Sequence, residues 1–185
     1  LINRPIKDPP GSKFVYNSGL STLLGAMIER RSFLSINEFA QKYLFGPLGI
    51  IKYELGYLDK ARKVPHSSGG LFLRPRDMAK LGALVLNGGR WGETQVVSKA
   101  WMQESAGARI QTDGPEKYGY LWWRAELPLG DGAMPVIFAM GLGSQFISVF
   151  PSLDMIVVMT GGNQDNGKHF APGRLLATHL FSSMS

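Results

Sequence analysis

The sequence has no cysteine among its 185 residues. A chain without cysteine has no disulfide framework, no thiol nucleophile and no cysteine-based zinc site. It also contains no apolar run of the roughly 18 residues that a membrane-spanning helix needs, so we expect no membrane span. These absences exclude several classes of protein, but they do not indicate a cellular compartment.

Acidic residues are also few, and their positions do not suggest a hydrolase that uses paired carboxylates. The chain has 14 Asp and Glu against 20 Lys and Arg, which gives a net charge of +6. Asp77 falls in the first turn of a predicted helix, where the helix dipole accounts for it. The basic residues occur in short, scattered clusters without interleaved aromatic residues, so we expect no nucleic-acid partner.

The chain has three histidines, His66, His169 and His179. None has the spacing of a metal ligand relative to another histidine or a carboxylate, so we expect neither a metal site nor a cofactor. No serine lies in a Gly-x-Ser-x-Gly elbow, although the sequence leaves a Ser-His-Asp triad open. We interpret His66 as a residue of a loop or of the rim of a cleft.

Helical periodicity dominates residues up to about 110. Apolar residues recur at helical spacing over residues 19–31, which predicts a helix with one buried face. Ser35 and Glu38 match a capping box and predict a second helix that ends before Gly46. Residues 51–68 have no sustained period and predict a loop with at most a short strand.

Two more helices are predicted in this part of the chain. One begins at Pro75, which suits a first helical turn, and ends at the Asn-Gly-Gly of residues 87–89. The other runs from about Ser98 to Ser105, anchored by Trp101.

Beyond residue 115 the pattern changes to aromatic and β-branched runs, at residues 118–123, 136–139, 145–150 and 155–159. Their short connections predict antiparallel neighbours, because a parallel crossover needs a dozen or more residues. A closing helix is predicted from Pro172 to Leu180. The expected fold is therefore α+β, with a helical part at about 1–110 followed, at about 115–185, by an antiparallel sheet covered by a C-terminal helix.

The stretch 14–19, Phe-Val-Tyr-Asn-Ser-Gly, leads directly into the first predicted helix. A phenol such as Tyr16, held beside short polar side chains at a helix N-terminus, can relay protons or bind an anion. In the alternative interpretation, Asn17 or Ser18 caps the helix and Tyr16 packs its ring. The sequence leaves both interpretations open.

The glycine-rich stretch 141–145 is similar in composition to a phosphate-binding loop, but it lacks the lysine and the following helix that such a loop needs. Glycines between two strands allow close backbone approach, so an exposed N–H here could serve an oxyanion hole. A plain hairpin turn is the other interpretation, and both stay open.

The order of these motifs resembles the serine β-lactamase and penicillin-binding-protein superfamily, in particular its class C-like branch of esterases and amide hydrolases. Residues 10–25 resemble that branch's Pro-Gly-x-x-Phe-x-Tyr-Ser-Asn segment with the helix that follows it, and residues 45–50 resemble its Pro-Leu-Gly turn. Residues 68–91 resemble its middle segment. Residues 139–145 fall where the family has a Lys-Thr-Gly or His-x-Gly strand, so the resemblance covers nearly the whole chain.

The resemblance implies a role for each of several residues. Tyr16 matches the family tyrosine that works with a lysine to shuttle the proton of the nucleophile. Ser18 stands at the substrate-binding asparagine of the family, and Gly141 matches the glycine of the third motif. The N–H of Leu142 would then be the second oxyanion donor, while Ala139 occupies the place of the family's Lys or His.

The family's nucleophile belongs to a Ser-x-x-Lys motif upstream of the tyrosine, and no serine in this sequence is followed by a lysine three residues later. Residues 1–5 do not form a signal peptide. The first residue is Leu rather than Met, so we expect a processed, cleaved or truncated product. The resemblance therefore implies a single partial domain over residues 1–185, with an incomplete β-lactamase/transpeptidase-like fold. It is expected to be the C-terminal part of a serine hydrolase that cleaves a small-molecule ester or amide through an acyl-enzyme, and to be inactive alone.

A non-catalytic module that binds penicillin-like or cell-wall-like ligands is the alternative, suggested by the missing nucleophile, Ala139 and Ser18. In either case the sheet would expose an edge and apolar surface, so the chain should need its missing N-terminal part or a self-association partner. The resemblance favours a periplasmic or secreted location.

Overall fold

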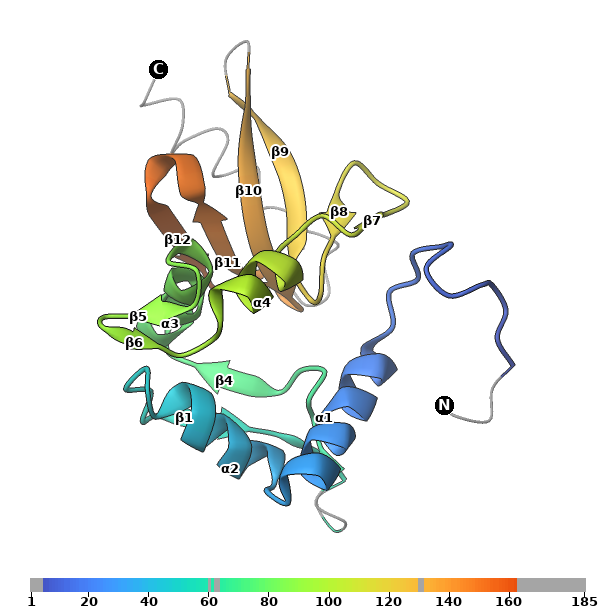
Figure 1. Cartoon of the computed structure of the whole chain (residues 1–185), viewed down its shortest axis with the longest axis vertical. Coiled ribbons are helices and arrows are strands. Elements are labelled where there is room, and N and C mark those ends of the chain that lie inside the picture. The colour runs from blue at the N-terminus through green and yellow to red at the C-terminus, as the bar shows by residue number, and fades with distance from the viewer. Residues whose placement is uncertain (1–4, 60, 62–63, 130–131, 163–185) are drawn as a thin grey trace. The chain divides into compact units, whose positions relative to one another are not determined.

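A computed structural model shows the fold of the chain and describes residues 5–59, 61, 64–129 and 132–162 (Figure 1). The chain divides into two compact units, Leu1–Arg74 and Pro75–Ser185. The expected single partial domain over residues 1–185 stays a prediction.

In the N-terminal unit, helical segments precede short antiparallel strands. The elements are α1 (Ser18–Ser32), α2 (Ile36–Ala40), the π-helical turn η1 (Gln41–Phe45), β1 (Tyr53–Leu55), β2 (Tyr57–Asp59), β3 (Val64–Pro65) and β4 (Leu71–Leu73). β1 pairs with β4 and β2 pairs with β3. The prediction of a loop with at most a short strand at 51–68 is therefore wrong. Strands of two or three residues are too short to show a period, and β1 forms by pairing with a strand further along the chain.

Ser35 begins α2 through the predicted capping box. Its hydroxyl oxygen accepts a hydrogen bond from the N–H of Glu38 at 3.2 Å, and the Glu38 carboxylate accepts one from the N–H of Ser35 at 2.8 Å. Hydrogen bonds from the hydroxyl and then from the N–H of Ser35 lower the pKa of Glu38. The helical turns end before Gly46, as predicted. The segment around this turn contributes the buried side chains Phe45, Leu48 and Ile50.

Helix α1 has the predicted range but not the predicted buried face. Leu20, Leu24 and Met27 are 52%, 50% and 57% exposed. They recur at positions i, i+4 and i+7, so they form one apolar row along the helix, the α1 stripe. The described residues of the N-terminal unit do not bury the α1 stripe, so the expectation of one buried face is wrong for these side chains within this unit.

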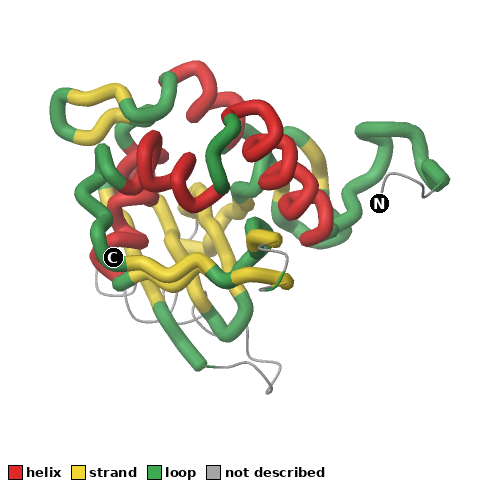
Figure 2. The backbone as a smooth tube through the Cα atoms, turned by 90° about the horizontal axis from the view of Figure 1, so that it is seen from below, coloured by secondary structure: helices red, strands yellow, loops and turns green. Residues whose placement is uncertain are grey.

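The C-terminal unit is built around an antiparallel sheet. Its elements are α3 (Pro75–Leu86), β5 (Arg90–Trp91), β6 (Thr94–Gln95), α4 (Lys99–Ser105), β7 (Ile110–Gln111), β8 (Lys117–Tyr118), β9 (Trp123–Leu129), β10 (Gly132–Gly141), β11 (Gln145–Phe150), the 3-10 turn η2 (Pro151–Leu153) and β12 (Met155–Met159). Among the described residues, the main sheet has the order β12-β11-β10-β9-β8-β7, and its strands appear as yellow segments in Figure 2.

Every neighbouring pair in this sheet is antiparallel, as the short connections predicted. The α+β class, with helices followed by an antiparallel sheet, is confirmed. The covering helix predicted from Pro172 to Leu180 lies outside the described residues, as do His169 and His179. No helix in the described part of the chain combines the length and the apolar character needed to cross a membrane.

Successive side chains of a strand point to opposite sides of the sheet. In β10 and β11, side chains on both sides are buried, in two separate apolar clusters. One face carries the cluster of Ile137, Ile147 and Val149 with the apolar side of α3. The other face carries the cluster of Met134, Val136, Phe138, Phe146 and Phe150.

Helix α3 meets the sheet at Gly82. A Cβ atom at this position would lie 2.8 Å from Cγ2 of Ile156 and 2.9 Å from Cγ2 of Ile147. Carbon atoms do not pack this closely, since their favourable separation is about 3.5–4.0 Å. The absence of a side chain at residue 82 therefore allows the close approach of helix and sheet.

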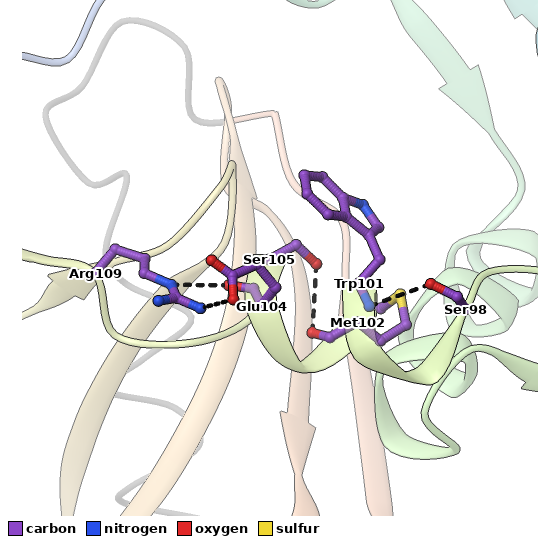
Figure 3. A network of polar contacts seen from close by, with 6 residues as sticks. All are labelled: Ser98, Trp101, Met102, Glu104, Ser105 and Arg109. Carbon is purple, nitrogen blue, oxygen red and sulfur yellow. Dashed lines mark hydrogen bonds and ion pairs between the residues drawn. The ribbon is translucent and has the colours of Figure 1, made fainter.

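Helix α4 begins at the predicted cap, where the hydroxyl oxygen of Ser98 accepts a hydrogen bond from the N–H of Trp101 at 3.3 Å. The anchoring role predicted for Trp101 is wrong: its indole is 52% exposed and points away from the helix, whereas Met102 is buried (Figure 3). Trp101 instead stacks on Tyr120, with ring centroids 5.7 Å apart and planes inclined by 18°.

The backbone turns between β8 and β9, within the stretch 118–123 that was predicted as one strand. The N–H of Tyr120 donates to the carbonyl of Ser105 at the end of α4, at 2.8 Å, and Leu121 has a φ of 70°. The strand prediction is wrong here because this hydrogen bond to α4 draws the backbone out of the sheet.

Arg109 contacts both the end of α4 and Tyr120 in the turn between β8 and β9. Its guanidinium forms an ion pair with the Glu104 carboxylate and donates from Nε to the Glu104 carbonyl at 3.2 Å (Figure 3). It also lies 5.8 Å from the ring centroid of Tyr120.

Replacing Gly82 by alanine should destabilise the protein. Judged by helix propensity alone, alanine in place of glycine would stabilise the interior of a helix by about 1 kcal/mol. Overpacking costs typically about 1–3 kcal/mol, so we expect Gly82→Ala to lower the free energy of unfolding measured in urea. A variant more stable than the wild type would contradict the close approach of α3 to the sheet.

Candidate active site

Tyr16 lies on the loop that leads into α1, and its side chain is 58% exposed. The interpretation in which its ring packs into a core therefore does not hold. An exposed phenol next to a helix N-terminus is accessible to a ligand.

Asn17 and Ser18 take different positions at the start of α1. Asn17 is the N-cap, because its Oδ1 accepts a hydrogen bond from the N–H of Gly19 at 2.8 Å. Ser18 is the first residue of the helix and is exposed. Of the two capping candidates, the structure selects Asn17, whose carbonyl oxygen is engaged by the backbone of its own helix.

The loop after β3 is fixed to α1 by two serines. The hydroxyl of Ser67 donates to the carbonyl of Ser21 at 3.1 Å, and the hydroxyl of Thr22 donates to that of Ser68 at 3.3 Å. These bonds fasten residues 67 and 68 to the first turns of the helix that follows Tyr16.

Gly25 makes this attachment possible. A Cβ atom there would lie 2.2 Å from Oγ and 2.8 Å from Cβ of Ser67. Sequence reasoning missed the contact between the helix and the loop. The available signal was a glycine in a helix interior, which usually has a packing reason.

His66 lies in the same loop, as its position in the sequence predicted. The backbone N–H of His66 donates to the carbonyl of Gly56 at 3.0 Å. Its half-buried ring packs over Gly69 and Gly70, where added Cβ atoms would lie 2.9 Å and 3.2 Å from ring atoms. Within the described residues, no group of three or more His, Cys, Asp or Glu could hold a metal ion.

The glycine-rich stretch forms the hairpin turn between β10 and β11. Gly141 pairs with Gln145 at the end of the hairpin, and the side chain of Leu142 is 71% exposed at its tip. Gly143 and Ser144 are buried and have φ values of 80° and 70°. The turn therefore presents residue 142 to solvent while the next two residues face inward.

The candidate site residues thus fall into two pairs. Tyr16 and Ser18 belong to the N-terminal unit, at the entrance to α1, and Gly141 and Leu142 belong to the C-terminal unit, at the hairpin turn. Ser18 is part of α1, and Gly141 is paired with Gln145 across the hairpin.

Solved structures of hydrolases and penicillin-binding proteins are similar to this chain. One is assigned as a 6-aminohexanoate-dimer hydrolase from Bacillus anthracis, with TM-score 0.73 and 24% identity, covering 94% of this chain and 46% of its own. A penicillin binding protein from Bacillus halodurans has TM-score 0.71 and 21% identity, covering 93% and 59%. An octameric penicillin-binding protein homologue from Pyrococcus abyssi has TM-score 0.68 and 23% identity, covering 91% and 44%.

These similarities define the class of protein: a β-lactamase/transpeptidase-like fold of mixed α and β structure with antiparallel sheets. The Beta-lactamase family model matches residues 1–179, so the chain belongs to the beta-lactamase family of hydrolases, and the resemblance seen in the motifs is confirmed. The comparison with curated proteins found no match. The chain spans about half the length of the structures it resembles, with 46%, 59% and 44% of them covered.

Two substitutions of Asn17 separate capping from other roles. Asn17→Ala removes the acceptor for the Gly19 N–H and should lower the free energy of unfolding by about 1 kcal/mol, whereas Asn17→Asp keeps an acceptor and should stay close to wild type. Urea denaturation of both variants measures this difference. If Asn17→Asp destabilised the protein as much as Asn17→Ala, the side chain would have a role other than capping.

Proposed function

We propose that the chain is the C-terminal part of a β-lactamase-like serine hydrolase that cleaves a small-molecule ester or amide through an acyl-enzyme. The observation that carries the proposal is the match of the family model to residues 1–179, in a chain that covers about half of each of the three solved structures described above. No serine of the chain is followed by a lysine three residues later, so the proposal places the Ser-x-x-Lys nucleophile in sequence outside this chain.

In the proposed reaction the serine hydroxyl attacks the carbonyl carbon, and its proton passes by way of Tyr16 and the lysine to the leaving group as the ester or amide bond breaks. Water then attacks the acyl carbon of the acyl-enzyme. Its hydroxyl group leaves with the acyl product as a carboxylic acid, and its second proton passes to the serine oxygen as the acyl–serine bond breaks. A residue can act as a proton relay only if the substrate can reach it. The 58% exposure of Tyr16 supports this role.

We propose that the backbone N–H of Leu142 is the second oxyanion donor. It would donate a hydrogen bond to the carbonyl oxygen of the substrate and stabilise the negative charge that develops there. Donors that are fixed before the reaction stabilise such a charge without reorganisation. The position of Leu142 at the tip of a buried hairpin supports this assignment. Gly141 and Ser18 are proposed to bind the substrate beside these groups.

A non-catalytic ligand-binding module is the second candidate. The third motif has Ala139 where the family has a Lys or His, and this residue is half-buried beside the cluster that packs on α3. A short apolar side chain there cannot bind a carboxylate as an ammonium or imidazolium would. A protein that binds a penicillin-like ligand without turnover would fit this second candidate.

Tyr16→Phe distinguishes the two candidates in the full-length protein that contains this chain. Loss of a proton relay should lower kcat for a nitrophenyl ester by about 10²-fold or more and leave KM nearly unchanged. Tyr57→Phe is the matched control, since Tyr57 is a tyrosine of the same unit that is 44% exposed. Full activity of Tyr16→Phe, or ester hydrolysis by a protein without an upstream Ser-x-x-Lys, would refute the proposed mechanism.

The α1 stripe is the proposed contact surface for the missing N-terminal part or for a self-association partner. Its three side chains are each about half exposed, and contiguous apolar surface of this kind marks interaction sites. The octameric state of the Pyrococcus abyssi homologue supports self-association within this fold.

Sedimentation of the isolated 185-residue chain tests this surface. We expect dimers or larger species, and we expect Leu24→Glu to shift them toward monomer because the charge would be buried in the contact. A wild-type chain that sediments as a stable monomer, with no binding to the N-terminal part, would contradict the proposed contact.

A further inference from the structure

We propose that Gln145 is a positioning residue that fixes the turn between β10 and β11 and thereby the N–H of Leu142. The inference rests on the proposed function, because it concerns the geometry of the oxyanion donor assigned there. It adds a residue to which neither the motifs nor the fold family assigned a role.

The side-chain amide of Gln145 joins the turn to the segment that follows the neighbouring strand, β12. Its Nε2 donates to the carbonyl of Gly143 at 3.2 Å and to the carbonyl of Gly161 at 2.5 Å. Gly143 lies in the turn, whereas Gly161 follows β12, the strand that pairs with β11. One amide group therefore connects the tip of the hairpin to backbone that is 16 residues away along the chain.

The bond to Gly143 meets a specific need of this turn. Gly143 is a buried residue, and backbone carbonyls of buried residues usually have a hydrogen-bond donor. The next residue, Ser144, is also buried and has a φ of 70°, a conformation that costs free energy for any residue other than glycine. Such a conformation persists only where the surrounding structure holds it in place. The Gln145 amide contributes to this, because it bonds to Gly143, the residue directly before Ser144.

The same side chain explains why residue 141 is a glycine. The φ of Gly141 is not in the left-handed region, so its backbone does not require glycine. A Cβ atom at residue 141 would lie 3.3 Å from Cβ and 3.6 Å from Cγ of Gln145. Glycine therefore leaves room for the Gln145 side chain to lie across the end of the hairpin. The residues on both sides of Leu142 are thus constrained through Gln145, one by packing and one by a hydrogen bond.

Gln111 offers a matched control, because its amide also bridges two carbonyls in a hairpin. Its Nε2 donates to Gly114 at 2.8 Å and to Glu116 at 2.9 Å. Gln111 is exposed and its contacts are local, between β7 and β8. Changing either glutamine to glutamate replaces a donor by a carboxylate that repels two carbonyl oxygens, so Gln145→Glu and Gln111→Glu make the same chemical change in two different turns.

The test has two measurements. In the 185-residue chain, amide hydrogen exchange at residues 142–144 should become faster in Gln145→Glu than in wild type or in Gln111→Glu. In the full-length protein, Gln145→Glu should lower kcat for a nitrophenyl ester about tenfold with KM nearly unchanged, since complete loss of an oxyanion donor costs about 10²–10³ in kcat. Gln111→Glu should keep the wild-type kcat.

Different outcomes overturn different statements. Unchanged exchange at 142–144, or a wild-type kcat in Gln145→Glu, would overturn the positioning role. An equal loss of kcat in Gln111→Glu would also overturn it, because the effect would then be general destabilisation. If the wild-type protein hydrolysed no ester, or if Tyr16→Phe were fully active, the proposed function would fail, while the exchange measurement would still decide whether Gln145 holds the turn.

Discussion

Burial of the β10–β11 hairpin on both faces is the constraint on which the C-terminal unit depends. Val149 and Phe150 are adjacent in β11 and both have no exposed surface, although they belong to opposite faces of the sheet. A strand buried in this way has one permitted register, because a shift of one residue would exchange the two faces. The register in turn sets where Gly82 meets the sheet and where the turn with Leu142 emerges.

In the N-terminal unit, helix α1 fixes the position of a candidate site residue, as the β10–β11 hairpin does in the C-terminal unit. Asn17 fixes where the helix begins, and the Ser67 loop fixes its first turns through the space that Gly25 leaves. Tyr16 is consequently an exposed side chain on a loop whose end is fixed, which is the kind of support that a positioned catalytic group requires. The α1 stripe has no comparable cover among the described residues of its own unit.

The sequence predicted what depends on local pattern. The capping box at Ser35 and the range of α3 follow from neighbouring residues, and short connections were sufficient to predict an antiparallel sheet. Contacts between distant segments were not predictable, because no local period records them. Asp77 shows the difference: the helix dipole accounts for its place, but its near-complete burial and its ion pair with Lys80 at 2.9 Å depend on tertiary packing. The exposure of Trp101 and the turn at Leu121 depend on contacts of α4 in the same way.

For the candidate site, the sequence indicated the residues through their order, and the structure added how each pair is held. The account requires that the attacking serine lie outside these 185 residues, in a Ser-x-x-Lys motif. The most direct test is to treat the full-length protein with a fluorophosphonate and to locate the adduct by peptide mass spectrometry. The account predicts a single adduct on a serine upstream of this chain. An adduct on any residue of this chain would contradict it.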